Sequence, residues 1–317
     1  MFNYKNYNCC SNYSKDTAEN QSISMRKENF QLLPAKKRHD SNDKVTKLFF
    51  APADEEVISG KMLILEPTRR GSKKVITKIT FDAGTRFNSF DKEVLNACTS
   101  QFVEGFNAIS LGIIYRLMTG KKSTHLADSM RIAILDSLNK LISTNVTIDA
   151  SQVCTALKYN GGNPFTYTGA ILPAQIVEGK IRGKESTIVK FEKLPPLYEL
   201  ATLRHRKKKD GGQVLTYDVD LLNTGNGIST TIENILVKNH TLRRILENRH
   251  KEMSNRVTLE EILKTTGIIK TKRWQSQDLR NYIDNMLKSW QQQNIFKGYK
   301  WLKKYAQIYG FEILYKD

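Results

Sequence analysis

The chain has 317 residues, a length that accommodates two modest hydrophobic cores joined by a linker. Its 50 Lys and Arg residues outnumber its 32 Asp and Glu residues, and the net charge of +18 favours a polyanion, above all nucleic acid, as partner. The sequence has no run of about eighteen apolar residues and no apolar N-terminal signal region, so it predicts a cytoplasmic protein without a membrane partner.

The cysteines do not predict a metal site. None of Cys9, Cys10, Cys98 and Cys154 belongs to a C-x-x-C pair or has a histidine at the spacing of zinc ligands. Cys98 falls on the apolar stripe of a predicted helix, which favours a reduced thiol in a core over a catalytic one. Reduced thiols agree with the cytoplasmic location.

Residues 1–60 are predicted to form a disordered arm. They are rich in Asn, Ser, Lys and Tyr, and they lack helical or strand periodicity. The basic run from Lys36 to Arg38 lies in this arm, where a solvated surface is the more common explanation than a phosphate site.

A first folded domain is predicted over residues 61–203. It begins with two strand-like runs, KMLILE and VITKITF. A helix is predicted next, because the apolar residues that follow recur every four positions and give a single buried stripe. Asn88 or Ser89 can cap its start.

Two further helices and a set of strands complete this first domain. Ser110 caps the second helix, and Gly120 stands where a left-handed C-terminal cap is needed. The third helix is predicted from Thr124 and gives way to the strand-like run NVTID. Further strands between Phe165 and Phe191 predict an enlarged β-wing.

Residues 204–227 are predicted to be an exposed basic linker, because the run RHRKKKDGGQ combines like charges with paired glycines. The second domain is predicted over residues 228–317. It opens with a helix from about Thr231, whose Lys238 and Arg243 are expected to face solvent.

The rest of the second domain repeats the order of the first. A capping box at Thr258 to Glu261 starts a short helix that Gly267 closes, and a third helix runs from about Ser276 to Gln293. Two runs rich in aromatic and β-branched residues, IFKGYKWLKK and QIYGFEILY, then predict a hairpin. Three helices followed by a hairpin are typical of a winged helix, so we predict an α+β protein with two winged-helix domains in tandem.

The third helix of the second domain is the candidate recognition helix. Its buried stripe leaves a polar face whose amides and arginine can pair with adenine and guanine edges, and cations just before it suit phosphates. A polar outer face is also normal for any helix of a soluble protein, so the net charge and the hairpin carry part of this inference. The candidate residues are Lys270, Lys272, Arg273, Gln275, Gln277, Arg280, Asn281 and Lys288.

Lysines cluster at the turn of the last hairpin, where a wing would reach the DNA backbone or the minor groove. The alternative is that they protect an edge strand from unwanted pairing. These residues are Lys297, Lys300, Lys303 and Lys304.

The third helix of the first domain is less suited to DNA. It exposes Asp128 and Asp136, and carboxylates close to phosphates are repulsive. We therefore expect this domain to contact a protein partner, with Lys121 and Lys122 as candidate phosphate contacts beside it.

The sequence predicts neither an enzyme nor a cofactor. A nicking initiator needs two histidines flanking one apolar residue to hold a metal, whereas every histidine here is isolated. The run TGKKST, Thr119 to Thr124, lacks the earlier glycine and the following Ser or Thr of an ATP-binding loop.

The order of elements from Phe81 to Tyr315 resembles that of the tandem winged-helix replication initiators of theta-replicating plasmids, in the branch of Gram-positive plasmids and mobile elements. The resemblance implies that the C-terminal domain binds repeated sites at an origin, with Gln277, Arg280 and Asn281 reading bases. It also implies a homodimer and contacts with host replication proteins. The segments that carry it are FDKEVLNAC, TGKKSTHL to SLNKLISTNVTID, LPPLYELA and SNRVTLEEILKTTGI.

Two alternatives share these features. A winged-helix transcriptional repressor or autoregulator would need the same groove contacts as an initiator. A non-enzymatic structural protein whose basic patches hold anionic partners would show no preference for DNA sequence.

Overall fold

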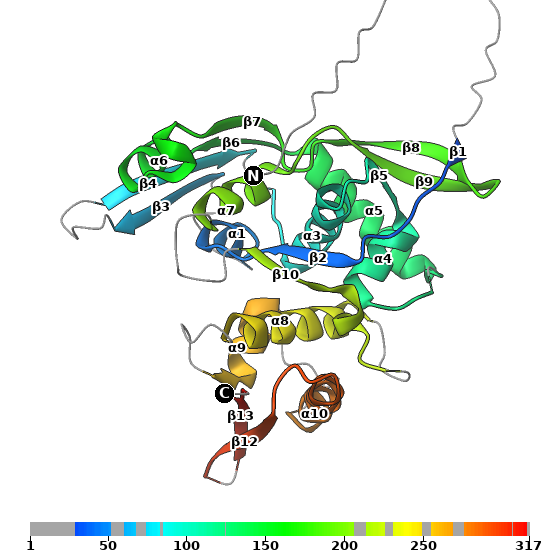
Figure 1. Cartoon of the computed structure of the whole chain (residues 1–317), viewed down its shortest axis with the longest axis vertical. Helices are drawn as coiled ribbons and strands as arrows, with labels where there is room; N and C mark the ends of the chain where they lie inside the picture. Colours follow the sequence, from blue (N-terminus) through cyan, green and yellow to red (C-terminus); the bar gives the residue numbers. More distant parts are fainter. Residues whose placement is uncertain are drawn as a thin grey trace, which may run out of the picture.

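The computed structural model describes residues 29–51, 60–67, 74–82, 85–123, 125–205, 214–225, 231–248, 255–268, 276–305 and 307–315. Within these residues the chain combines helices with small, mostly antiparallel sheets, so the expected α+β class is confirmed. Figure 1 shows two groups of elements, with the long helix α8 lying between them.

The first unit combines three helices with a hairpin. The short strand between the first two helices, β5, pairs antiparallel with β9, and β9 pairs antiparallel with β8. The order is therefore helix, strand, helix, helix and hairpin. These elements are α3 (Ser89–Val103), β5 (Ala108–Ser110), α4 (Leu111–Thr119), α5 (Asp128–Ser143), β8 (Ala174–Ile181) and β9 (Lys184–Phe191).

Local sequence explains the ends of these helices. Asn88 caps α3 in a capping box with Asp91, and the hydroxyl of Ser110 accepts the N–H of Ile113 at the start of α4. Gly120 closes α4 with a φ of 72°, as predicted. The third helix begins at Asp128 and not at Thr124, since the Ser123 hydroxyl accepts the His125 N–H in a local turn.

A second sheet combines two strands that precede α3 with two strands that lie between α5 and β8. Its strands stand in the order β3-β4-β6-β7, so β6 and β7 do not extend the β8–β9 hairpin. The prediction of one enlarged wing between Phe165 and Phe191 is therefore wrong, because β7 pairs with β6, whereas β8 and β9 pair with each other and β9 pairs with β5. The elements are β3 (Lys61–Pro67), β4 (Lys74–Phe81), β6 (Asn145–Asp149), α6 (Ser151–Leu157), the 3-10 turn η1 (Tyr159–Gly162) and β7 (Thr166–Ala170).

Part of the expected arm is ordered. β1 (Asn29–Phe30) pairs parallel with β8, while β2 (Lys37–Ser41) pairs antiparallel with β10 (Val214–Asp218). Asp43 caps α1 (Lys44–Phe49) by accepting two backbone N–H groups. The prediction of disorder is wrong for residues 29–51, since long-range pairing and buried charges stabilise this polar segment.

The expected linker 204–227 is also partly ordered. Its residues 214–222 form β10 and the 3-10 turn η2 (Val219–Leu222), while residues 206–213 lie outside the described residues. The helix α7 (Pro196–His205) extends into its first two residues. Strand pairing with β2 places β10 against the first unit.

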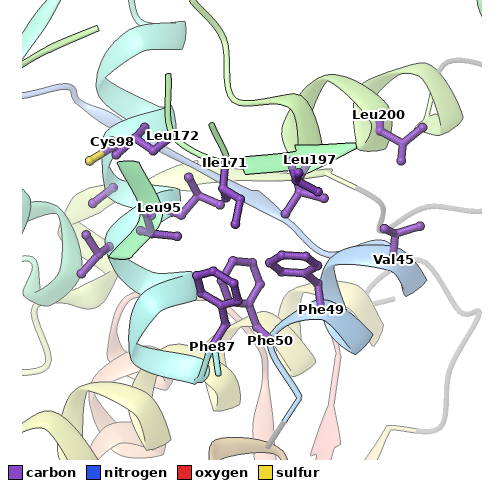
Figure 2. Packing of buried hydrophobic residues seen from close by; sticks show 14 of the residues in the cluster. Val45, Phe49, Phe50, Phe87, Leu95, Cys98, Ile171, Leu172, Leu197 and Leu200 are labelled. Carbon is purple, nitrogen blue, oxygen red and sulfur yellow. The ribbon is translucent and has the colours of Figure 1, made fainter. Parts of the chain in front are cut away.

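Aromatic rings fill the core of the first unit. Phe49 of α1 stacks on Phe87, with ring centroids 5.0 Å apart and an interplanar angle of 28°. Figure 2 shows Phe50 beside this pair, with Leu197 of α7 packed above. Cys98 lies in the same core as a free thiol, and burial raises its pKa to about 12, as expected for an unreactive cysteine.

The second unit has the same order of elements as the first. β11 pairs antiparallel with β13, and β13 pairs antiparallel with β12. Thr258 and Gly267 cap the short helix as predicted. The elements are α8 (Ile232–Asn248), β11 (Arg256–Thr258), α9 (Leu259–Thr266), α10 (Ser276–Gln292), β12 (Gly298–Lys304) and β13 (Gln307–Leu314).

The helix α8 contributes to both cores. Ile235 and Leu236 pack in the first, whereas Leu242 and Ile245 pack in the second. A single rigid element thus joins the two units.

A buried ion quartet joins α8 to the first unit. Arg38 contacts Asp40 at 2.6 Å and Glu93 at 2.8 Å, and Arg243 contacts Glu93 at 2.5 Å and Asp40 at 3.3 Å. The side chains of Arg38, Asp40 and Glu93 are 0% exposed, and that of Arg243 is 8% exposed. Burial alone would raise the pKa of Asp40, but Arg38 and Arg243 lower it to about 2.

The solvent-facing positions predicted for α8 are therefore wrong. Lys238 and Arg243 are both buried, because this face of α8 docks on α3 and α4 and Arg243 pairs with Asp40 of β2. Lys238 donates to the carbonyls of Thr119 and Leu222 at 2.8 and 2.7 Å. Burial, together with the positive charge of Lys121, lowers the pKa of Lys238 to about 7.

Candidate nucleic-acid interface

The helix α10 and the hairpin β12–β13 form one continuous surface. Asp284 of α10 accepts the Tyr299 hydroxyl at 2.7 Å and the indole N–H of Trp301 at 3.1 Å. Both donors stand on β12, so a single carboxylate fastens the hairpin to the helix. Figure 1 shows α10 and the hairpin at the end of the molecule remote from the first unit.

The same surface is anchored to the body of the protein from behind. Trp290 is fully buried, and its indole N–H donates to the carbonyl of Leu221 at 2.7 Å. Tyr282 donates to the carbonyl of Asn234 in α8 at 2.7 Å. The exposed side of α10 is thus presented by a rigid scaffold.

Amides occupy that exposed side. Gln277 donates from Nε2 to Oδ1 of Asn281 at 3.0 Å, and both side chains are exposed. Asn285 is exposed one turn further along, and the sequence prediction missed it. Its position four residues after Asn281 was the available signal. Gln277, Asn281 and Asn285 form a row of side chains that can donate and accept, as base edges require.

Arg280 lies at the border between α10 and the hairpin. Its guanidinium carbon is 5.6 Å from the centroid of the Trp301 ring, within the range of a cation–π contact. Among the described residues no carboxylate forms an ion pair with it. The helix and the hairpin therefore meet at this cation.

Two of the predicted cations already have carboxylate partners. Lys288 pairs with Asp284 at 2.8 Å, and Lys300 pairs with Glu312 at 2.6 Å. Glu312 also contacts Arg256 at 3.4 Å across β11 and β13. Each side chain remains about 60% exposed, at 62% for Lys288 and 60% for Lys300, but its charge is partly neutralised.

The carboxylate of Asp284 accepts hydrogen bonds from three neighbouring side chains. Burial alone would raise the pKa of Asp284, but hydrogen bonds from Lys288, Tyr299 and Trp301 lower it. Its negative charge is thus paired, which reduces its repulsion of a phosphate. Asp278, in the first turn of α10, is exposed.

The turn of the hairpin carries an aromatic ring directly after two lysines. Tyr305 is 91% exposed with a φ of 49°, and Nζ of Lys304 lies 5.7 Å from its ring centroid. Lys303 is exposed and forms no ion pair within the part of the chain that the structure describes. The sequence prediction missed Tyr305, because it stands in the turn between the two strand-like runs and a single tyrosine there is not a specific signal. Lys297, also exposed, stands where the hairpin begins.

The remaining predicted residues lie elsewhere. Lys121 and Lys122 follow Gly120 in the first unit, where the charge of Lys121 acts on Lys238 of α8. Among the described residues, no hydrogen bond or ion pair joins either lysine to α10 or its hairpin. Lys270, Lys272, Arg273 and Gln275 lie outside the described residues. The candidate surface consists of α10 and the β12–β13 hairpin.

The described residues contain no group of three or more His, Cys, Asp or Glu residues placed to hold a metal ion. Of the helices described, none has the length and apolar character needed to cross a bilayer.

Comparison with known proteins identifies no family. No protein-family model matches the chain, and no curated protein matches it. Among solved structures, the chain is similar to domains 2 and 3 of RctB. A selenomethionine derivative of these domains gives a TM-score of 0.40 at 14% identity, with 83% of this chain and 93% of that chain covered. RctB-155-483 gives a TM-score of 0.42 at 11% identity, with 84% and 94% covered. Both likenesses are distant, so the function is argued below from this chain's own residues.

Proposed function

We propose that this protein binds double-stranded DNA sequence-specifically through two winged-helix domains and acts as the replication initiator of a plasmid or mobile element. In this proposal it needs no cofactor, performs no catalysis, and works as a homodimer that recruits host replication proteins. The observation that carries the DNA-binding part is the surface of α10 and the β12–β13 hairpin. There exposed amides lie beside Arg280, a cation that has no carboxylate partner among the described residues.

The connectivity supports the winged-helix part of the proposal. Helix, strand, helix, helix and hairpin occur in this order in both units, with β6, α6 and β7 inserted before the hairpin of the first. In each unit the short strand pairs with the last strand. In such a module the third helix enters the major groove and the hairpin reaches the backbone or minor groove. In the second unit these elements are α10 and the β12–β13 hairpin, whose turn carries Lys303, Lys304 and Tyr305.

The test is selection of bound duplexes from a random DNA pool at near-physiological salt, followed by sequencing. A single recovered motif supports sequence-specific binding, whereas recovery without any motif contradicts it and leaves a nonspecific polyanion binder. A plasmid that carries spaced copies of the motif then separates initiator from repressor. Replication in a host without another initiator supports initiation, and promoter repression without replication supports a repressor.

Lys303→Ala is expected to weaken binding to all duplexes by a similar factor. Loss of one phosphate contact should reduce the slope of log K against log salt by about 0.9. Lys300→Ala is the matched control, because the ammonium of Lys300 already pairs with Glu312. Affinity measured at several salt concentrations checks the prediction. Equal effects of the two substitutions would show that the ion pair does not decide which lysine meets DNA.

A further inference from the structure

Three side chains meet where α10 touches the hairpin. Asp284 accepts the indole N–H of Trp301 at 3.1 Å, and Arg280 lies one turn before Asp284 on α10, with its guanidinium carbon 5.6 Å from the Trp301 ring centroid. The carboxylate and the guanidinium therefore contact the same indole, one through its N–H group and the other through its ring.

The position of the Trp301 ring is fixed by several contacts. Phe311 meets it edge-on with centroids 5.9 Å apart, and Tyr299 meets it edge-on at 6.3 Å. Tyr299 is itself held by Asp284 through a hydrogen bond of 2.7 Å. The surface on which Arg280 rests is thus preorganised, and a side chain that rests on it loses less freedom when it binds a ligand.

The side chain of Arg280 has different contacts from the neighbouring cations. Lys288 and Lys300 give their donors to carboxylates, whereas Arg280 rests against an aromatic ring. A ring attracts a cation through its quadrupole and does not consume N–H donors that point away from it. Arg280 therefore keeps a planar set of donors, the arrangement that matches the O6 and N7 acceptors of guanine.

We propose that Arg280 recognises one guanine of the DNA site through paired hydrogen bonds to O6 and N7, and that Trp301, held by Asp284, is its positioning residue. This inference rests on the proposed DNA-binding function and adds a base and a positioning mechanism to it. A phosphate offers a similar pair of acceptors, but a phosphate contact is lost equally on every sequence, while a guanine contact is lost at one position.

The first test compares Arg280→Lys with the wild-type protein. Lysine keeps the charge and loses the planar fork. Preference for guanine at one position of the selected motif should fall about tenfold, which corresponds to about 1.4 kcal/mol. Affinity for random-sequence duplex and the salt dependence should stay within about twofold. An unchanged profile at every position, or a uniform loss on all duplexes, overturns the guanine assignment.

The second test asks whether Trp301 acts through Arg280. Trp301→Leu removes the ring and should reduce preference at the same guanine, whereas Trp301→Phe keeps a ring face and should retain most of it. Because the two residues act together, Trp301→Leu should add little to the loss of preference already caused by Arg280→Lys. Additive effects in the double variant, or a loss by Trp301→Phe equal to that by Trp301→Leu, overturn the positioning role.

Thermal unfolding of each variant shows whether a loss of binding comes from a lost contact or from a lost fold. If Trp301→Leu does not fold, Arg280→Lys still tests the guanine contact. The two levels of the proposal fail differently. If the wild-type protein selects no motif, the DNA-binding function and this inference fail together. If the wild-type protein selects a motif and Arg280→Lys leaves every position unchanged, the inference alone fails.

Discussion

Arg243→Met is expected to lower the free energy of unfolding by about 3–5 kcal/mol, because it removes one partner from a buried set of charges. Asp40 and Glu93 would then share Arg38 alone, with their side chains 0% exposed and inaccessible to water. Tyr217 donates to Asp40 at 2.7 Å and Asn239 donates to Glu93 at 2.7 Å, but these neutral donors do not replace a charge.

Urea unfolding followed by circular dichroism measures this effect. Arg256→Met is the matched control, since the same residue type pairs with Glu312 at 3.4 Å while 60% exposed. An exposed pair contributes about 0–1 kcal/mol, so the control should unfold close to the wild-type protein. Equal midpoints for the two variants would show that the buried ion quartet adds no net stability.

Trp290→Ala is expected to cost about 3–5 kcal/mol, the usual range for removal of a large buried ring. Trp290 is fully buried in the second core, and its indole N–H is the donor to Leu221 in η2 at 2.7 Å. The substitution leaves a cavity under α10 and an unpaired carbonyl, so DNA affinity should also fall through displacement of the candidate recognition helix.

Trp290→Phe provides the graded comparison for this prediction. Phenylalanine keeps most of the apolar contact and loses the hydrogen bond, so it should cost about 1 kcal/mol for that bond together with a smaller cavity cost. Urea unfolding of the three proteins gives the order wild type, Trp290→Phe, Trp290→Ala. If the alanine variant unfolds at the wild-type midpoint, Trp290 does not anchor α10.

Short-range features of the fold were predictable from the sequence. The caps at Asn88, Ser110 and Thr258 and the left-handed glycines Gly120 and Gly267 all stand where they were expected. A cap satisfies backbone groups within one helical turn, so the residues that decide it are neighbours in the sequence. The two hairpins were predictable for the same reason, because their paired strands are neighbours in the sequence.

The burial of charged segments was not predictable. Arg38 looked like part of a solvated basic run, yet its guanidinium is fully buried and its partner Glu93 is 55 positions away. Arg243 and Asp40 are 203 positions apart. No local pattern reports such pairs, because a charge is tolerated in a core only when distant elements bring its partner within contact distance.

The candidate surface shows the same division between sequence and structure. The polar face of α10 and the lysines of the hairpin were visible in the sequence, since helical spacing and strand alternation place them. Their individual states were not, because Lys288 and Lys300 have carboxylate partners while Arg280 rests on Trp301. The sequence by itself thus determined the three helices and the hairpin of each unit, and that cations gather on the last helix and hairpin. Only the tertiary structure decided which of those cations keep their donors for a ligand, because neutralisation requires an oppositely charged atom a few ångströms away, and packing alone sets that distance.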